Sequence, residues 1–160
     1  MPSTLELREE PYDGPAAQAL VDAVQQEYVA RYGGPDETPV APAEFAPPAG
    51  RFLVGYVGTR PVATGGLRRV ASDTVEIKRM FVAAEFRGQG FARQVLARLE
   101  EIALELGATR VVLETGTRQP EAIELYRSSG YTPLEGFGHY AADGGLGFEK
   151  LLAADPRVRA

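Results

Sequence analysis

The segment with the clearest potential for chemistry is a glycine-containing turn, RGQGFA, at residues 87–92. It connects a strand-like run to a helix-like run, so several backbone amides would gather at a helix N-terminus, where they and the helix dipole can bind phosphate oxygens. Gly88 and Gly90 lack Cβ atoms and would let a ligand approach the backbone closely, and Arg87 adds a positive charge. A tight strand-to-helix connection without any ligand explains the two glycines equally well.

Two other phosphate-binding motifs do not fit the sequence. There is no GxxxxGK followed by Ser or Thr, which excludes a P-loop. A dinucleotide-binding fingerprint would need a third glycine where Arg93 stands, and it would open a βαβ unit rather than follow a run of hairpins. Nicotinamide binding is therefore not expected.

The elements that must position this turn can be read from the apolar and turn residues. In chain order the patterns predict a strand over 5–9, a helix from 15 to about 31, a proline-rich loop over 33–50 with one helical turn around 43–45, strands over 52–57, 61–70 and 74–82, a helix over 91–106, a strand over 109–114, a helix from 120 stopped at Gly130, and a closing strand pair over 131–134 and 147–152.

Short turns join the three central strands, which predicts an antiparallel meander. The continuous apolar run TRVVLE, at residues 109–114, is typical of a parallel strand covered on both faces. The fold class is therefore α/β with a mixed sheet, mostly antiparallel, containing one parallel strand pair and flanked by helices. With 160 residues and no evident linker, we expect a single domain over 1–160.

Composition narrows the function classes. The net charge of −5 provides no general positive field for nucleic acid, so no nucleic-acid partner is expected. The chain has no cysteine and a single histidine, His139, which excludes thiolate chemistry and zinc sites built on two histidines, and no metal is expected. No run of about 18 apolar residues and no export signal occur, so no membrane partner is expected and the cytoplasm is the expected location.

Two blocks of the sequence resemble the Gcn5-related N-acetyltransferase (GNAT) family. The run EIKRMFVAAEFRGQGFARQVLARLEEIA is similar to that family's acetyl-CoA-binding core, and Arg87, Gly90 and Ala92 match its Arg/Gln-x-x-Gly-x-Gly/Ala signature. LETGTRQPEAIELYRSSGY resembles its second block, in which a helix presents a tyrosine, here Tyr126, shortly before a glycine–aromatic pair. The predicted element order agrees with the family's fold from about residue 5 to 152.

The resemblance implies that acetyl-CoA, as co-substrate, lies between splayed strands ending at Val82 and Glu114. Its pyrophosphate would bind the backbone amides just before and at the start of the central helix. Its pantetheine arm would pair with the backbone of the preceding strand. An amide near Val82 in that strand would stabilise the oxyanion that forms on the thioester carbonyl. The coenzyme-binding residues implied are Met80, Phe81, Val82, Arg87, Gly88, Gln89, Gly90, Phe91, Ala92, Arg93 and Gln119.

Glu76 and Tyr126 are the catalytic residues implied by the resemblance. An alkyl ammonium with a pKa of roughly 10.4 must lose a proton before it attacks, and Glu76 occupies a strand position where some family members keep a glutamate base. An ion pair with Lys78, Arg79 or Arg68 explains Glu76 equally well. Tyr126 would protonate the departing thiolate.

Several other residues have weaker assignments. Gln119 stands where many family members keep an asparagine near the pantetheine, and His139 reads as a loop residue. By analogy with the family's topology, the acceptor pocket would be lined by Glu27, Tyr28, Tyr32, Arg68, Arg69 and Tyr140, although exposed helix and strand surfaces account for them as well.

We therefore expect an N-acetyltransferase that moves an acetyl group from acetyl-CoA to a primary amine of a small molecule or a protein, by direct attack in a ternary complex. A CoA-binding module without catalysis is the alternative, and a hydrolase using Glu76 and Glu114 is a third hypothesis with little support. The resemblance is compatible with a homodimer, although no interface can be read from the chain.

Overall fold

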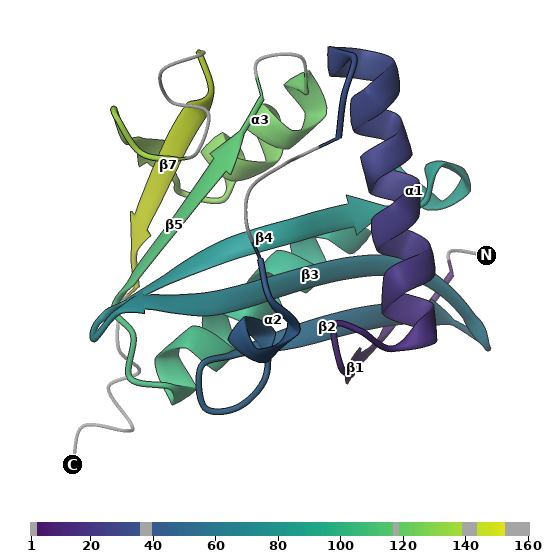
Figure 1. The fold of residues 1–160 in the computed structure, drawn as a ribbon, viewed down its shortest axis with the longest axis horizontal. Coiled ribbons are helices and arrows are strands. Elements are labelled where there is room, and N and C mark those ends of the chain that lie inside the picture. The colour runs from purple at the N-terminus through teal and green to yellow at the C-terminus, as the bar shows by residue number, and fades with distance from the viewer. Residues whose placement is uncertain (1–2, 36–39, 117–118, 139–143, 153–160) are drawn as a thin grey trace.

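A seven-stranded mixed sheet forms the centre of the computed structural model, which describes residues 3–35, 40–116, 119–138 and 144–152. The strands lie in the order β1-β2-β3-β4-β5-β7-β6 (Figure 1). Their bounds are β1 Glu6–Glu9, β2 Gly50–Val57, β3 Arg60–Ala71, β4 Thr74–Val82, β5 Arg110–Thr115, β6 Thr132–Pro133 and β7 Leu146–Leu151. The helices are α1 Pro15–Tyr32, α2 Phe91–Glu105 and α3 Pro120–Ser128, with single 3₁₀ turns at Pro42–Phe45 and Ala84–Phe86.

The pairing of the strands confirms the predicted mixed sheet. β1 to β4 are antiparallel neighbours, β4 and β5 are parallel with α2 as their crossover, and β7 is antiparallel to both β5 and β6. The predicted strand over 131–134 is shorter than expected, because β6 pairs with β7 only at Thr132 and Pro133. Just beyond it, the Leu134 amide still donates to the Gly147 carbonyl at 2.8 Å.

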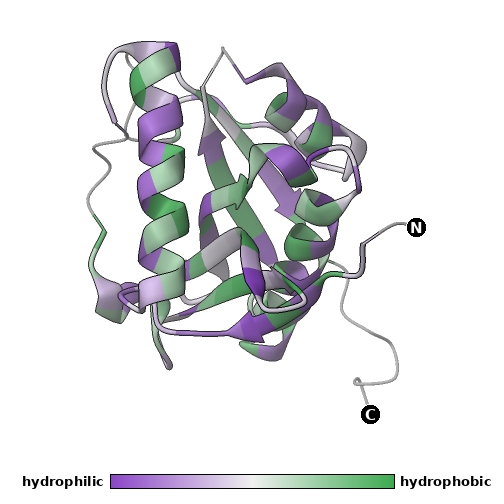
Figure 2. Cartoon of the chain, turned by 90° about the vertical axis from the view of Figure 1, so that its right-hand side faces the viewer, coloured by the Kyte–Doolittle hydropathy of each residue, from purple (hydrophilic) through white to green (hydrophobic). Residues whose placement is uncertain are grey.

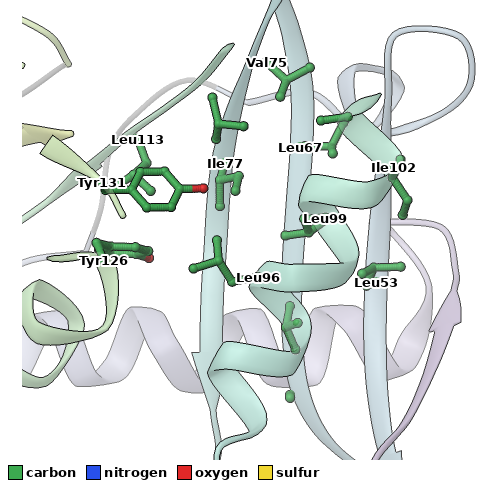
Figure 3. Close-up of a cluster of buried hydrophobic side chains, with 14 of the residues drawn as sticks. Leu53, Leu67, Val75, Ile77, Leu96, Leu99, Ile102, Leu113, Tyr126 and Tyr131 are labelled. Carbon is green, nitrogen blue, oxygen red and sulfur yellow. The ribbon is translucent and has the colours of Figure 1, made fainter. Parts of the chain in front are cut away.

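The larger core lies between the sheet and α2. Leu96, Leu99 and Ile102 lie on one side of α2 and are buried against strand residues such as Leu67 and Ile77 (Figure 3). Leu99 and Ile102 belong to the apolar stripe at helical spacing that predicts this helix. α2 is thereby fixed against the sheet, and its first turn stands beside the end of β4 (Figure 1).

A second, smaller core lies on the opposite face of the sheet under α1. Ala17, Leu20 and Val21 pack with Phe52 and Val54 of β2. Figure 2 shows hydrophobic and hydrophilic residues alternating along α1, as expected for a helix with one buried side. The two helices thus cover opposite faces of the sheet, and α1 extends past β4 toward β5 (Figure 1).

None of the helices in the described ranges combines the length and the apolarity that crossing a bilayer requires.

Candidate active site

β4 and β5 separate partway along their length. Their parallel pairing covers Thr74–Ile77 against Arg110–Leu113 and stops there, and the two strands diverge beyond it (Figure 1). A bulge marks the departure: the register between β3 and β4 shifts, and Arg79 has a φ of 61°. The hydroxyl of the buried Thr64 donates a hydrogen bond of 2.8 Å to the Arg79 carbonyl and fixes the bulge. The splay is therefore part of the sheet's own structure.

A cleft of about 310 Å³ occupies the space between the splayed strands. Its walls come from α1, β4, the first turn of α2, the end of β5 and α3. Ten of the residues predicted to bind coenzyme line it: Met80, Phe81, Val82, Arg87, Gly88, Gly90, Phe91, Ala92, Arg93 and Gln119. Gln89 does not line the cleft, because its side chain lies toward the N-terminal segment and accepts a hydrogen bond of 3.3 Å from the Ser3 amide.

The glycine-containing turn forms one end of the cleft. Gly88 and Gly90 both have φ of 81°, a left-handed conformation that favours glycine, and a Cβ at either position would point into open space. α2 begins immediately afterwards at Phe91, so the amides of its first turn have no partners within the helix. The turn is thus an open backbone surface at a helix N-terminus, which suits phosphate oxygens.

Two arginines stand beside this turn. Arg87 donates from Nε to the Val82 carbonyl at 2.9 Å, and its guanidinium pairs with Glu27 of α1 at 2.7 Å. Arg93 donates to the hydroxyls of Ser129 and Ser128 at 3.0 and 2.8 Å. Both side chains are held near the cleft, and Glu27 is a carboxylate that a bound phosphate would have to replace at Arg87.

Tyr126 of α3 also lines the cleft, where it is 5% exposed. Its ring packs edge to face against Tyr131, with ring centroids 5.7 Å apart (Figure 3). Tyr131 in turn donates a hydrogen bond of 2.9 Å to Glu100. Burial raises the pKa of the Tyr126 phenol above its ordinary value, and nearby Tyr28 adds to this effect. The Tyr126 phenol is therefore protonated at neutral pH.

Glu76 is placed differently from Tyr126. It is not one of the residues that line the cleft, and its carboxylate accepts from Arg68 of β3 at 2.9 Å. Arg68 also pairs with Glu44 at 3.0 Å, and the Glu76 side chain is 7% exposed. Glu76 thus forms the ion pair with Arg68 that was the alternative explanation for a glutamate at this position. Its role as a catalytic base stays a prediction.

A family model described as the acetyltransferase (GNAT) family matches residues 18–131, a range that holds the splayed strands, the glycine turn and Tyr126. The chain belongs to that family. Among curated proteins it is 38% identical over 103 residues to an IAA acetyltransferase of Azospirillum brasilense, a match covering 62% of this chain and 65% of that protein. It spans only 34 to 38% of the lengths of the mammalian N-acetyltransferases that it also matches.

Solved structures of GNAT proteins superpose on most of the chain. A Klebsiella pneumoniae protein described as an acyl-CoA N-acyltransferase gives a TM-score of 0.78 at 25% identity, covering 94% of this chain and 99% of that one. A GNAT family acetyltransferase of Elizabethkingia anophelis, solved with acetyl-CoA bound, gives 0.69 at 16% identity and covers 92% and 98%. These likenesses confirm the predicted GNAT fold.

The residues predicted for the acceptor pocket of this GNAT domain fall in several places. Glu27 and Tyr28 of α1 line the cleft. Tyr32, at the end of α1, lies so close to Gly116 that a Cβ there would collide with its hydroxyl. Arg68 is held by Glu76, and Arg69 points away to the carbonyls of Ser72 and Leu106. His139 and Tyr140 lie outside the described residues.

Two charged residues that the sequence offers only as ion-pair partners of Glu76, Lys78 and Arg79, also line the cleft. Lys78 and Arg79 are each 7% exposed although both carry charge, and Glu114 of β5 is a further lining residue. Two consecutive cations inside a mostly apolar strand are the signal that the sequence offers, because burying a charge is costly without a purpose.

Within the described ranges, the side chains of His, Cys, Asp and Glu form no group of three that could hold a metal ion.

Proposed function

We propose that the protein is an N-acetyltransferase that transfers the acetyl group of acetyl-CoA to a primary amine by direct attack in a ternary complex. The observation that carries the proposal is the continuity of the cleft: it runs from the open backbone of Gly88 and Gly90 along β4 to the buried phenol of Tyr126. The backbone amides of the turn can bind the diphosphate of acetyl-CoA, and the Tyr126 phenol can protonate its departing thiolate.

β4 supplies the middle of the site. Beyond Ile77 it no longer pairs with β5, so its backbone on that side is available to an extended ligand. A pantetheine arm could bind there in the manner of an added strand. The Val82 carbonyl accepts from Arg87, which orients the end of the strand, and an amide near Val82 would stabilise the oxyanion that forms on the thioester carbonyl.

The chemistry requires one bond to form and one to break. The neutral amine nitrogen bonds to the thioester carbon, the carbonyl oxygen takes up negative charge, and the carbon–sulfur bond then breaks with its electron pair leaving on sulfur. Tyr126 donates its proton to that sulfur and regains one from solvent. The amine loses its proton to water in this proposal, since the Glu76 carboxylate is engaged with Arg68 and lies outside the cleft lining.

Two measurements test the proposal. Calorimetric titration with acetyl-CoA should give a single site, and release of free thiol from acetyl-CoA should depend on an added amine. Binding without thiol release across a broad amine panel would favour the alternative, an acyl-CoA-binding module without catalysis. No binding heat at all would refute both functions.

A further inference from the structure

Tyr131 is a buried tyrosine that touches Tyr126 but does not itself line the cleft. It is 3% exposed, and its ring packs edge to face against the Tyr126 ring (Figure 3). Its backbone amide donates a hydrogen bond of 3.0 Å to the Tyr126 carbonyl. One backbone contact and one ring contact therefore join Tyr131 to the phenol that the proposed function uses as its acid.

The hydroxyl of Tyr131 is anchored outside the cleft. It donates a hydrogen bond of 2.9 Å to Glu100 of α2, whose side chain is 17% exposed. Lys150 of β7 pairs with Glu100 at 2.9 Å, and its ammonium stands 5.7 Å from the centroid of the Tyr131 ring. Burying a hydroxyl against a carboxylate has a cost in free energy that a phenylalanine at this position would avoid while filling the same space. The hydroxyl therefore points to a purpose beyond packing.

The hydroxyl of Tyr126 has no comparable anchor. Among the residues that the structure describes, none accepts a hydrogen bond from it, and burial and Tyr28 are what raise the pKa of this phenol. A group that must give its proton to a substrate needs a free hydroxyl, so its direction has to be set through its ring. The two rings packed against it belong to Tyr131 and Phe148, at centroid distances of 5.7 and 6.2 Å. Of these two neighbours, Tyr131 has the polar anchor.

The anchor lies on the helix that would bind the coenzyme. The first turn of α2, from Phe91 to Arg93, lines the cleft. Glu100 follows Phe91 by nine residues in the same helix, which is about 14 Å along its axis. Leu96 and Leu99, between them, are buried against the sheet. The proposed diphosphate site and the anchor of Tyr131 therefore belong to one rigid element.

We propose that Tyr131 is a positioning residue, which holds the Tyr126 phenol at the angle from which its proton reaches the departing thiolate. The inference rests on the proposed function and deepens it. Without the bond to Glu100 the Tyr131 ring can turn, and the Tyr126 ring packed against it turns too. Misplacing a reacting group by about 1 Å can lower a rate by up to roughly 10²-fold. Coenzyme affinity is not affected, because Tyr131 and Glu100 lie outside the cleft lining.

A double-mutant cycle tests this role. Tyr131→Phe keeps the ring and removes the hydrogen bond to Glu100, and thiol release from acetyl-CoA is measured with the amine that turns over fastest. In the wild-type background the substitution should lower kcat about tenfold and change KM for acetyl-CoA less than about twofold. In a Tyr126→Phe background it should change kcat less than about twofold, because no phenolic proton is left to place. Equal losses in both backgrounds, or no loss in the wild type, would overturn the inference.

Tyr56→Phe is the matched control. Tyr56 is also a buried tyrosine, 9% exposed, whose hydroxyl donates to a glutamate, Glu10. It belongs to the second core under α1 and does not line the cleft. Its replacement removes a bond of the same kind and should leave kcat unchanged. If Tyr56→Phe loses as much kcat as Tyr131→Phe, the effect is a general loss of stability and the positioning role is wrong.

Two substitutions of Glu100 give an independent check. Glu100→Gln keeps an oxygen that can accept from Tyr131, and it should keep kcat within about threefold of the wild type. Glu100→Leu fills a similar space without an acceptor and should lower kcat as much as Tyr131→Phe does. Circular dichroism and thermal denaturation establish that each variant is folded at the assay temperature. Full activity in Glu100→Leu, or an equal loss in both variants, would contradict a role for this hydrogen bond.

The proposed function and the positioning role fail differently. If no amine supports thiol release, or if Tyr126→Phe is as fast as the wild type, the proposed reaction or its acid is wrong, and the role of Tyr131 is refuted with it. If Tyr126→Phe is slow while Tyr131→Phe is not, the acid stands and only the positioning role is wrong.

Discussion

Replacing Gly90 by alanine separates the cost of backbone strain from the loss of a ligand site. Gly90 has φ of 81°, and a Cβ at this position would contact nothing within 4 Å, so the protein can accommodate the methyl group sterically. A left-handed conformation costs a residue other than glycine about 1–2 kcal/mol. For a chain of this size, each kcal/mol lowers the melting temperature by roughly 2–4 °C.

Gly107 offers a matched control at the other end of the same helix. It follows α2 with φ of 83° and also has open space where a Cβ would stand. Gly107→Ala should therefore lose the same 1–2 kcal/mol or so of stability. It lies far from the cleft lining and should leave acetyl-CoA binding unchanged.

The coenzyme affinities should distinguish the two variants. A Cβ at Gly90 would stand where a phosphate oxygen approaches the backbone, and loss of one hydrogen bond to a charged group costs about 1.5–3 kcal/mol. That is roughly a 10- to 150-fold rise in Kd. Thermal denaturation measures the loss of stability, and calorimetric titration measures the loss of acetyl-CoA affinity. If Gly90→Ala and Gly107→Ala bind acetyl-CoA equally well, the turn is a structural connection and the reasoning is refuted.

Three further substitutions test other parts of the site. Tyr126→Phe should lower kcat by a factor of roughly 10²–10⁴ while the fold is retained, and an unchanged kcat in this variant would mean that the ring only packs. Because burial raises the pKa of the Tyr126 phenol, its ionisation should not lower the wild-type kcat between pH 7 and 10. Glu76→Gln should cost about 1.5–3 kcal/mol of stability, because it weakens the bond from Arg68 while Arg68 keeps its pair with Glu44, and the pH profile of kcat should be unchanged. A selective loss of kcat at low pH would restore Glu76 as the base. Glu27→Gln should tighten acetyl-CoA binding several-fold by freeing Arg87 from its 2.7 Å partner, and weaker binding would show that Glu27 positions Arg87 for the phosphates.

Much of the fold could be predicted because its signals are local. The stripe through Leu99 and Ile102 defines α2, and the glycines of the turn and Gly107 mark its two ends. The apolar run over 109–114 identified the buried parallel strand, seen as β5. These features depend on neighbours a few residues away, which the sequence shows directly.

The inner end of the cleft could not be predicted, because tertiary contacts create it. Arg79 adopts its positive φ through a bulge whose carbonyl is held by Thr64, 15 residues earlier in the chain. Alternation along a strand places Glu76 and Lys78 on one face, but only the register with β3 brings Arg68 opposite Glu76. No local pattern distinguishes a base from an ion-pair partner in that situation.

The side chain of Gln89 illustrates the same limit within a motif. Its neighbours Gly88 and Gly90 were predicted to line the site and do so, whereas Gln89 faces the opposite way and contacts Ser3. A motif establishes which residues are adjacent in the chain, and the backbone dihedrals determine which of them face the ligand. Its backbone amide can still contribute to the turn.

A crystal structure of the protein with acetyl-CoA tests the central claim most directly. We expect the diphosphate on the backbone amides between Gly88 and Arg93, the pantetheine arm along β4 beyond Ile77, and the thioester sulfur within hydrogen-bond reach of the Tyr126 hydroxyl. Coenzyme bound at another surface, or a cleft that stays empty at saturating acetyl-CoA, would contradict the account.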